Sequence, residues 1–528
     1  MKISKKFTLV LTLLFALSVV LMGCSNKSAE VTKEGDTTEV KKEEPKKEEV
    51  KVEEPVELSW YFPNSPQQGL DGVNEALNEI LLEKINATVK LNLTDWGAYD
   101  QKINVMMSAG EAFDLVFTAT WSNNYFQNAA KGAYLPIDDL LDQYAPNTKK
   151  AIPDFVWPAV TVKGKIYGVP NYQTMAPGYG IILRKDFVDK YNFDWKSASK
   201  LEDVEPYLEA VKNGEMGIIP LEYSKNSDMF KSTSGYNGMD TIGDSGMPGW
   251  MYLDDNEYKV VNQYDTPEFK NHIKLMRDWY MKGYMRKDAA TLTDQGPDRK
   301  AGKIAAIFGG IDLDSNDFEA AGLDFPGRFK GLSDVEGYDK KFGDCLLNTD
   351  RVAATITAIS STSKNPEKAM QFLELMNSDV EVYNTMCYGV EGVNYKKVAD
   401  NRVETIAEGG YQIWSNWEFG NNLNAWYTEA SAEGEEVDNK GIKMWDNNNK
   451  TAAVSPLLGF VFDGESVKTE VANCNSVIEE LLYALGSGSV DPDEYQPIFI
   501  GKLQKAGADK IIAEKQSQVD QWRKDNGK

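Results

Sequence analysis

Apolar and polar positions alternate with two different periods along the first part of the chain's globular body. Residues 56–61 and 88–93 follow the two-residue alternation of strands, and residues 114–117 form a short apolar run of the same kind. The segments between them, 71–85 and 99–109, repeat apolar positions every three to four residues, as helices do. Strands that alternate with helices of this length predict a parallel sheet covered by helices, in which ligands bind beyond the carboxyl ends of the strands.

A second set of elements follows a break in this pattern. Gly164 favours a hairpin turn, and Gly168-Val169-Pro170 interrupts any regular element, so we expect the chain to cross between lobes near this point. Residues 232–255 have no clear period and are predicted to be a loop region. The elements predicted in this second lobe are strands at 181–184 and 304–308 and an amphipathic helix at 266–281, capped by Thr266 with Pro267 in its first turn.

The first 55 residues have a different pattern. Lys2, Lys5 and Lys6 precede an apolar run that ends at Leu21-Met22-Gly23-Cys24, which is the layout of a secretory signal. The run is shorter than the roughly 20 apolar residues that span a bilayer, which favours cleavage over anchoring. The alternative is an uncleaved hydrophobic anchor with a chance cysteine. The segment resembles the lipobox of bacterial lipoproteins, which implies cleavage after residue 23 and a diacylglycerol, with further acyl lipid, on Cys24.

Residues 25–54 are almost devoid of apolar side chains and rich in lysine, glutamate and proline. Such a segment buries too little surface to offset its loss of conformational entropy, so we predict a disordered tether from residue 24 to residue 55. Pro45 and Pro55 argue against the alternative, a charged helix with paired glutamates and lysines.

Length and charge narrow the class of protein. A chain of 528 residues is long enough for two or three lobes after removal of a leader. The 81 acidic and 57 basic residues give a formal net charge of −24, which repels phosphate backbones and anionic lipid. We therefore expect no nucleic-acid partner, and membrane contact through the lipid anchor only.

Cysteine and histidine are too sparse for most catalytic or metal sites. Cys345, Cys387 and Cys474 are far apart in sequence, which argues against both a disulfide scaffold and a zinc site and predicts buried thiols. His272 is the only histidine, and neither a GxSxG elbow nor an HExxH or Walker motif is present. Residues 312–316 have the D-x-D-x-N spacing of a calcium loop, but Asp317 stands where glycine is required, which favours a solvated acidic turn over calcium.

The aromatic residues are the remaining chemical signal, with 12 tryptophans and 25 tyrosines. A sugar ring has an apolar C–H face and a rim of hydroxyls, so its receptor needs aromatic platforms with polar side chains around them. Trp121 is the leading candidate because it follows an apolar strand in a polar loop, and Tyr172 and Glu391 come next, at predicted crossings between lobes. For each aromatic candidate, packing in the core is the alternative. The other candidates are Trp60, Tyr61, Asn124, Tyr125 and Trp250.

Several phrases, in order, resemble one family. Four segments resemble the extracellular solute-binding proteins of carbohydrate ABC importers, of the maltose-binding-protein-like type. They are YDQKINVMMSAGEAFDLVFTATW, KGAYLPIDDLLDQYAP, VKGKIYGVP and the start of a helix at Lys364-Asn365-Pro366. The end of the chain resembles a Gram-positive lipoprotein subgroup whose members have an additional C-terminal domain of unknown function. The matching segments are SPLLGFVFDGESVKTEVANCNSV and KLQKAGADKIIAEKQSQVDQW.

The resemblance implies an α/β, two-lobed, periplasmic-binding-protein-like fold of type II, in which each lobe is a sheet flanked by helices and hinge crossovers join them. Lobe 1 would comprise residues 56–172 and about 351–395, and lobe 2 residues 173–350. Residues 396–528 would complete lobe 2 and form the subgroup extension.

It further implies a monomeric binding protein without cofactor or catalysis, held at the extracellular face of the cell membrane. It would capture a carbohydrate, an oligosaccharide by our expectation, between the lobes and deliver it to the permease of an ABC transporter. Two alternatives stay open. One is a secreted glycoside-active enzyme, marked by two carboxylates about 5–10 Å apart across the cleft. The other is a peptide-binding or sensory receptor of the same fold.

Overall fold

The computed structural model describes the chain from residue 54 onward. The predicted signal, Cys24 and the tether up to residue 53 lie outside the described residues, as does all of the calcium-like loop except Ser315. Residues 54–528 are described except 177, 226–228, 244, 312–314, 316–326, 330–331, 333–334, 414 and 429–444.

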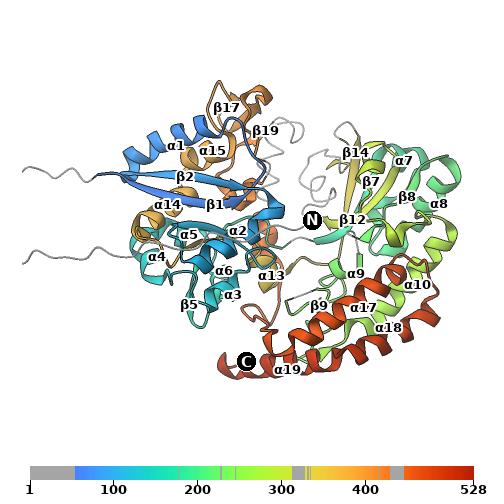
Figure 1. Ribbon diagram of the computed structural model, residues 1–528. Helices are drawn as coiled ribbons and strands as arrows, with labels where there is room; N and C mark the ends of the chain where they lie inside the picture. The colour runs from blue at the N-terminus through green and yellow to red at the C-terminus, as the bar shows by residue number, and fades with distance from the viewer. Residues whose placement is uncertain are drawn as a thin grey trace, which may run out of the picture. The chain divides into compact units, whose positions relative to one another are not determined.

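A five-stranded sheet, here called the first sheet, is built mainly from the N-terminal half of the body (Figure 1). Its central part is parallel, as predicted, because β1 pairs in parallel with both β2 and β3. A strand from much later in the chain, β16, lies antiparallel to β3 and joins it to β6. In spatial order the strands are β2 (Ala87–Thr94), β1 (Val56–Pro63), β3 (Leu115–Thr118), β16 (Ile356–Ile359) and β6 (Gly168–Pro170).

The helices that cover this sheet have the ends and faces that the sequence predicts. α1 (Leu70–Ile85) buries Val73, Leu77 and Leu81, which recur at helical spacing, and stops at Asn86 in the left-handed conformation. α2 (Trp96–Ala109) begins at Asp95, whose carboxylate accepts a hydrogen bond from the Gly97 amide. Other helices of this half of the body are α3 (Tyr125–Ala130), α4 (Asp138–Tyr144), α5 (Pro146–Ala151), α6 (Val156–Ala159), α14 (Pro366–Ser378) and α15 (Val380–Tyr388).

The second sheet is mixed and has β7 near its centre, antiparallel to both neighbours. Gly180 on β7 is required by close packing, because a Cβ there would lie 2.0 Å from the Lys340 carbonyl oxygen on the adjacent strand. Its strands, in order, are β13 (Gly327–Arg328), β14 (Glu336–Phe342), β7 (Gly178–Arg184), β12 (Ile304–Ile311) and β8 (Ile219–Leu221), with α7 (Lys185–Tyr191) and α8 (Glu205–Gly214) beside them.

A helical layer at the C-terminus packs on the predicted helix α10 (Pro267–Lys282) (Figure 1). The Thr266 hydroxyl accepts a hydrogen bond from the Phe269 amide, so the predicted cap of α10 is confirmed. A separate hydrophobic core joins α10 and the three-stranded sheet of β9 (Met239–Asp240), β10 (Trp250–Tyr252) and β11 (Val260–Val261) to α17 (Lys468–Gly486), α18 (Pro492–Ala506) and α19 (Ala508–Asp525).

Two crossovers join the two sheets. One runs from β6 through residues 171–176 to β7, at the position that the sequence indicates. The other returns from β14 through β15 (Leu346–Leu347) and α13 (Thr349–Val352) to β16. A later strand, β20 (Ala453–Val454), pairs in parallel with β15 and so lies against the return crossover.

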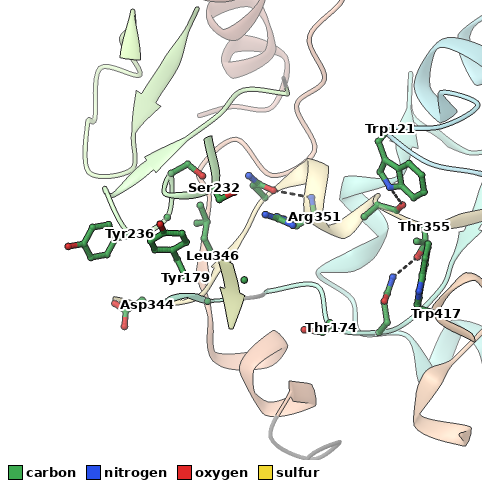
Figure 2. A pocket seen from close by; sticks show the side chains of 17 residues that line it. Trp121, Thr174, Tyr179, Ser232, Tyr236, Asp344, Leu346, Arg351, Thr355 and Trp417 are labelled. Carbon is green, nitrogen blue, oxygen red and sulfur yellow. Dashed lines mark hydrogen bonds between the residues drawn. The ribbon is translucent and has the colours of Figure 1, made fainter. Parts of the chain in front are cut away.

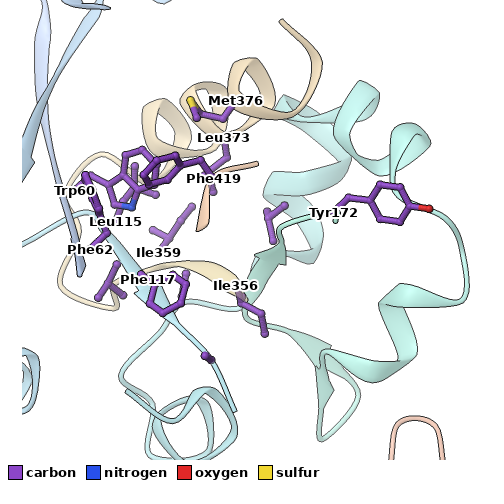
Figure 3. Close-up of a cluster of buried hydrophobic side chains, with 14 of the residues drawn as sticks. Trp60, Phe62, Leu115, Phe117, Tyr172, Ile356, Ile359, Leu373, Met376 and Phe419 are labelled. Atoms are coloured by element: carbon purple, nitrogen blue, oxygen red, sulfur yellow. The ribbon is translucent and has the colours of Figure 1, made fainter. Parts of the chain in front are cut away.

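The hydrophobic core beside the first sheet includes residues from the region after residue 396. Tyr411, Phe419 and Trp445 are buried in the same cluster as Trp60 and Ile359. Figure 3 shows Phe419 beside Trp60. Part of the region after residue 396 therefore packs against the first sheet. A second three-stranded sheet in this region contains β17 (Tyr395–Ala399), β18 (Arg402–Thr405) and β19 (Tyr427–Thr428).

The three cysteines of the body are free and buried, as the sequence predicts. His272 is also buried, with its ring centroid 5.5 Å from that of Phe230. In the part of the chain that the structure describes, no helix combines the length and apolar character needed to span a bilayer.

Candidate functional site

A cavity of about 560 Å³ lies at the two crossovers (Figure 2). The second sheet, both crossovers and the loop after β3 of the first sheet contribute to its wall. Aromatic residues come from the first-sheet side and from the second-sheet side, and polar residues come mainly from the crossovers. The lining residues used below are Trp121, Gln173, Tyr179, Tyr236, Asp344, Asn348, Arg351, Ala354, Thr355 and Trp417.

Tryptophans form the wall on the first-sheet side. Trp121 keeps 53% of its surface exposed, and its Nε1 donates a hydrogen bond of 2.8 Å to the Ala354 carbonyl oxygen. Its ring stacks on Trp96, with centroids 5.7 Å apart and an interplanar angle of 21°. The Trp417 ring is 6.2 Å from that of Trp121. The indole is thus fixed in orientation while one side stays open, which suits it to receive a flat apolar surface.

The loop that carries Trp121 is held by hydrogen bonds to helix α2 and strand β3. The Asp100 carboxylate accepts from the Ser122 hydroxyl at 2.6 Å and from the Asn123 amide at 3.0 Å. The Thr118 hydroxyl donates to the Asn123 carbonyl oxygen at 2.5 Å. Because both anchors are parts of regular elements, the position of the Trp121 ring is set by the first sheet.

Tyrosines form the wall on the second-sheet side. Tyr179 lies on β7 next to Tyr236, with ring centroids 5.8 Å apart, and stacks on Phe308 of β12 at 6.1 Å. Burial raises the pKa of Tyr236 above its usual value, so this phenol is a neutral donor and acceptor at physiological pH. Figure 2 shows Tyr179 and Tyr236 on one side of the cavity and Trp121 and Trp417 on the other.

Polar groups lie between the two aromatic walls. Gln173 donates to the Thr355 hydroxyl at 2.9 Å, which ties one crossover to the other. The Asn348 side chain accepts from the Arg351 amide at 3.0 Å and so caps the short helix α13. Arg351 and Asp344 are the only charged side chains among the described lining residues.

A buried asparagine supports the crossover behind Gln173. Asn449 Oδ1 accepts from the amides of Met175 at 2.8 Å and Ala176 at 3.1 Å, and its Nδ2 donates to the Gln173 carbonyl oxygen at 2.6 Å. Asn449 has no exposed surface. The side-chain amide of Asn449 can accept two hydrogen bonds and donate two. The backbone of residues 173–176 supplies the partners for three of these four.

The segment 445–455 contacts both crossovers, the first through Tyr172 and the return crossover through Leu347. Tyr172 donates to the Asp446 carboxylate at 2.7 Å, and the Ser455 amide donates to the Leu347 carbonyl oxygen at 2.8 Å. The Ser455 hydroxyl bonds to the buried Asp240 carboxyl, whose pKa is raised by desolvation. One stretch of chain therefore binds the backbones of both crossovers.

A buried carboxyl lies beside the tryptophan wall. Glu418 follows Trp417 on a short 3₁₀ helix, has no exposed surface, and has its pKa raised by burial to about 9. Its backbone carbonyl accepts from the Asn171 side chain at 2.6 Å. Neighbouring residues thus have opposite environments, Trp417 at the cavity and Glu418 in the core.

Of the eight residues that the sequence puts forward, Trp121 alone lines this cavity. Trp60, Tyr125, Tyr172 and Trp250 have 1% or less of their surface exposed, so packing, the alternative considered for each, describes where they lie. Trp250 stacks on Phe230 at 5.3 Å, in the C-terminal core.

The other three candidates also lie outside the cavity lining. Tyr61 is half-buried beneath Lys102, and the Asn124 side chain caps α3 through the Gln127 amide. Glu391 is exposed beside a bridge to Tyr395.

The cavity residues that sequence reasoning missed are Tyr179, Tyr236, Arg351 and Trp417. Tyr179 had a signal, since it precedes the predicted strand at 181–184 next to the expected crossing. Arg351 stood at the expected return to lobe 1. Tyr236 lies in the region 232–255, which the sequence predicts to be a loop, and loops carry binding residues more often than their share. Trp417 reaches the cavity through a tertiary contact that no local pattern encodes.

No group of three or more metal-ligating side chains that could hold an ion occurs among the described residues.

Comparison with known proteins gives the family context of this cavity. A carbohydrate ABC transporter substrate-binding protein of Streptococcus pneumoniae serotype 4 is 28% identical to this chain over 536 residues, which cover 99% of both proteins. The polygalacturonan/rhamnogalacturonan-binding protein YtcQ of Bacillus subtilis is 24% identical and covers 96% of this chain and 97% of its own.

The crystal structure of the N-glycan transport solute-binding protein NgtS from Streptococcus pneumoniae has a similar fold. It is 27% identical, covers 89% of this chain and 100% of its own, and superimposes with a TM-score of 0.76. A structure of NgtS in complex with Man5GlcNAc covers 89% of this chain and 99% of its own, with 28% identity and a TM-score of 0.65.

Two family patterns match the sequence. A domain of unknown function matches residues 456–524, the part that contains α17, α18 and α19, in agreement with the expected C-terminal domain. Residues 76–393 match the family described as bacterial extracellular solute-binding protein, and this range contains both crossovers and every strand of the two sheets except β1. The chain therefore belongs to the bacterial extracellular solute-binding proteins.

Proposed function

We propose that this protein captures an oligosaccharide in the cavity at the crossovers and delivers it to the permease of an ABC importer. The observation that carries the proposal is the pair of aromatic walls, Trp121 with Trp417 and Tyr179 with Tyr236, on opposite sides of one cavity. Aromatic rings receive the C–H faces of sugars, and the polar groups between the walls match a rim of hydroxyls.

The size of the cavity supports a ligand of more than one sugar ring. Its volume of about 560 Å³ lies within the ~300–1,000 Å³ typical of small-molecule sites. Two walls on different sheets suit a ligand that extends from one to the other. Relatives support the carbohydrate class: NgtS has been solved with Man1GlcNAc and with Man5GlcNAc.

Binding without turnover is part of the proposal. Hydrolysis of a glycosidic bond uses two carboxyl groups, and Asp344 is the one carboxylate among the described lining residues. The two relatives from Streptococcus pneumoniae named above are a carbohydrate ABC transporter substrate-binding protein and the N-glycan transport solute-binding protein NgtS. We propose that ligand contacts with both walls favour a closed arrangement of the two sheets, which the permease recognises.

The sequence of the leader supports a location at the cell surface. We propose that Cys24 carries the lipid anchor, that the tether lets a monomeric body reach its permease at the outer face of the membrane, and that binding needs no cofactor. Replacing Cys24 with alanine is expected to move the protein from the membrane fraction to the medium. Retention of the variant in the membrane would contradict the lipid anchor.

The central test is a thermal-shift and calorimetric screen of the full-length protein against oligosaccharides and peptides. A saturable shift in Tm with an oligosaccharide is expected, since a ligand stabilises the native state by mass action. Mass spectrometry after long incubation should recover the oligosaccharide intact. Products of cleavage would favour the enzyme alternative, and shifts with peptides alone would favour the peptide receptor.

A further inference from the structure

We propose that Arg351 binds the carboxylate of an acidic sugar residue, so that the preferred ligand is an oligosaccharide containing one hexuronate next to neutral sugars. This inference rests on the proposed function and specifies its substrate class. Two charged side chains are found among the described residues that line the cavity, the cation Arg351 and the anion Asp344.

Arg351 differs from the other arginines whose side chains are described. Its backbone amide caps α13 through Asn348, but its guanidinium has no hydrogen bond or ion pair among the described residues. The other arginines all interact with neighbouring residues. Carboxylates pair with three of them: Arg184 with Asp186, Arg286 with Asp288 and Asp298, and Arg299 with Glu222. Arg277 and Arg523 donate to the carbonyl oxygens of Gly488 and Glu257, and Arg402 also has an interaction partner.

This difference is informative because acidic partners are abundant. The chain has 81 acidic residues against 57 basic ones, and Arg184, Arg286 and Arg299 each pair with a carboxylate. Arg351 is exposed at the cavity, yet its planar array of donors is left for a group from outside. A carboxylate meets that array with two parallel hydrogen bonds, which single hydroxyls do not provide.

The position of Arg351 fits a sugar held by both aromatic walls. Figure 2 shows its side chain between the Trp121 and Trp417 side and the Tyr179 and Tyr236 side. It extends from α13, whose first turn is fixed by the Asn348 cap. A pyranose ring received on either wall would direct substituents toward the centre of the cavity, where the guanidinium lies.

Asp344 limits how many acidic residues the ligand carries. Its carboxylate is exposed at the same cavity, near the tyrosine wall in Figure 2, and has no ion-pair partner among the described residues. A second hexuronate there would place two carboxylates close together, whereas neutral sugar hydroxyls donate to Asp344. The two charges therefore favour a mixed oligosaccharide over a homopolymer of uronic acid.

The test compares acidic oligosaccharides with their carboxyl-reduced counterparts, which have the same rings and linkages without the charge. Calorimetry of the full-length protein with a panel of mixed oligosaccharides is expected to show binding about tenfold or more tighter for the acidic member of a pair, as for a charge-assisted bidentate contact. The preference should weaken as salt is raised, since the cavity is open to solvent.

Variants assign the preference to residues. Arg351→Gln should lower the affinity for the acidic ligand to about that of its carboxyl-reduced counterpart and so remove the acidic preference. The variant should fold normally, because the α13 cap uses the Arg351 backbone amide. Lys524→Gln, an exposed site on α19, is the matched control for net charge and should behave as the wild type. Asp344→Asn should strengthen binding of trigalacturonate more than that of a mixed ligand.

The outcomes separate this inference from the proposed function. Equal or tighter binding of the reduced ligands, or an acidic preference that survives Arg351→Gln, overturns the inference and leaves oligosaccharide capture intact. Binding of neutral oligosaccharides alone has the same meaning. Absence of binding to every oligosaccharide, acidic or neutral, overturns both.

Discussion

Two aromatic clusters beside the first sheet differ in how far they are buried. Around Trp60, the rings of Phe62, Phe372 and Phe419 lie with centroids 5.0–5.5 Å from the indole, and 1% of the Trp60 surface is exposed. Around Trp121, two further tryptophans lie at 5.7 and 6.2 Å, yet 53% of its surface remains open. Ring spacing alone therefore does not separate a packed core from an aromatic cluster that is open to solvent.

What separates them is the element that carries each ring. Trp60 stands inside a strand that has α14 packed over it, so every direction is filled. Trp121 stands in a loop beyond the end of β3, where the sheet stops and the crossovers begin. The predictions below test this distinction, beginning with the largest effect.

Trp60→Ala should lower the free energy of unfolding by about 3–5 kcal/mol, because it removes a large buried side chain and leaves a cavity. Chemical denaturation followed by fluorescence measures this change. Any folded fraction should bind oligosaccharide with wild-type affinity. A stable variant with weakened binding would instead place Trp60 at the ligand.

Glu418→Gln should stabilise the protein increasingly as pH rises. The pKa of Glu418 is about 9 in the folded state against 4.5 for the free side chain, so above pH 4.5 the unfolded chain releases a proton that the folded chain retains. Stability of the wild type is thereby lost as pH rises toward 9, by about 2 kcal/mol at pH 6.

Denaturation of both proteins between pH 5 and pH 8 tests this. The gain from Glu418→Gln should grow with pH, while ligand affinity should stay the same because Glu418 faces the core. A gain that is independent of pH would show that the carboxyl titrates normally.

Trp121→Ala should reduce oligosaccharide affinity by about tenfold, or roughly 1.4 kcal/mol, through loss of the stacking surface. Because half of the side chain is already exposed, its effect on unfolding should stay below about 1 kcal/mol. Calorimetry and denaturation together measure the two quantities. Trp121→Phe, which keeps a smaller platform, is the matched control and should retain part of the affinity.

His272 offers the smallest effect and the simplest observation, since its imidazole gives the only histidine signals in NMR spectra. Burial lowers its pKa from 6.5 to about 4, so below pH 6.5 the unfolded chain binds a proton that the folded chain does not. Stability should rise between pH 4 and pH 6.5, with a loss of about 1 kcal/mol at pH 5.5. A titration midpoint near 6.5 would contradict this.

More of the helices and strands than of the cavity residues can be predicted from the sequence. The first three strands, α1, α2, the Thr266 cap and the crossing after β6 follow from local periodicity and capping, which are short-range effects. The same alternation that places Trp60 on a strand does not say what covers it, because that depends on α14, some 300 residues later.

The site itself depends on long-range packing. Trp121 was identified because a polar loop after an apolar strand leaves few ways to bury an indole. Trp417 and Tyr236 come from segments without regular period, and they meet the cavity only because the chain returns twice to the crossovers. Such returns leave no trace in local pattern.

The segment that contains Asn449 and Ser455 bears on how many independent motions the body has. Asn449 holds the backbone from Gln173 to Ala176, and Ser455 holds Leu347, so the two crossovers are joined through a third stretch of chain. Each crossover can twist only if this stretch moves with it. A rotation of one sheet against the other would therefore have to carry this stretch along or break its hydrogen bonds to both crossovers.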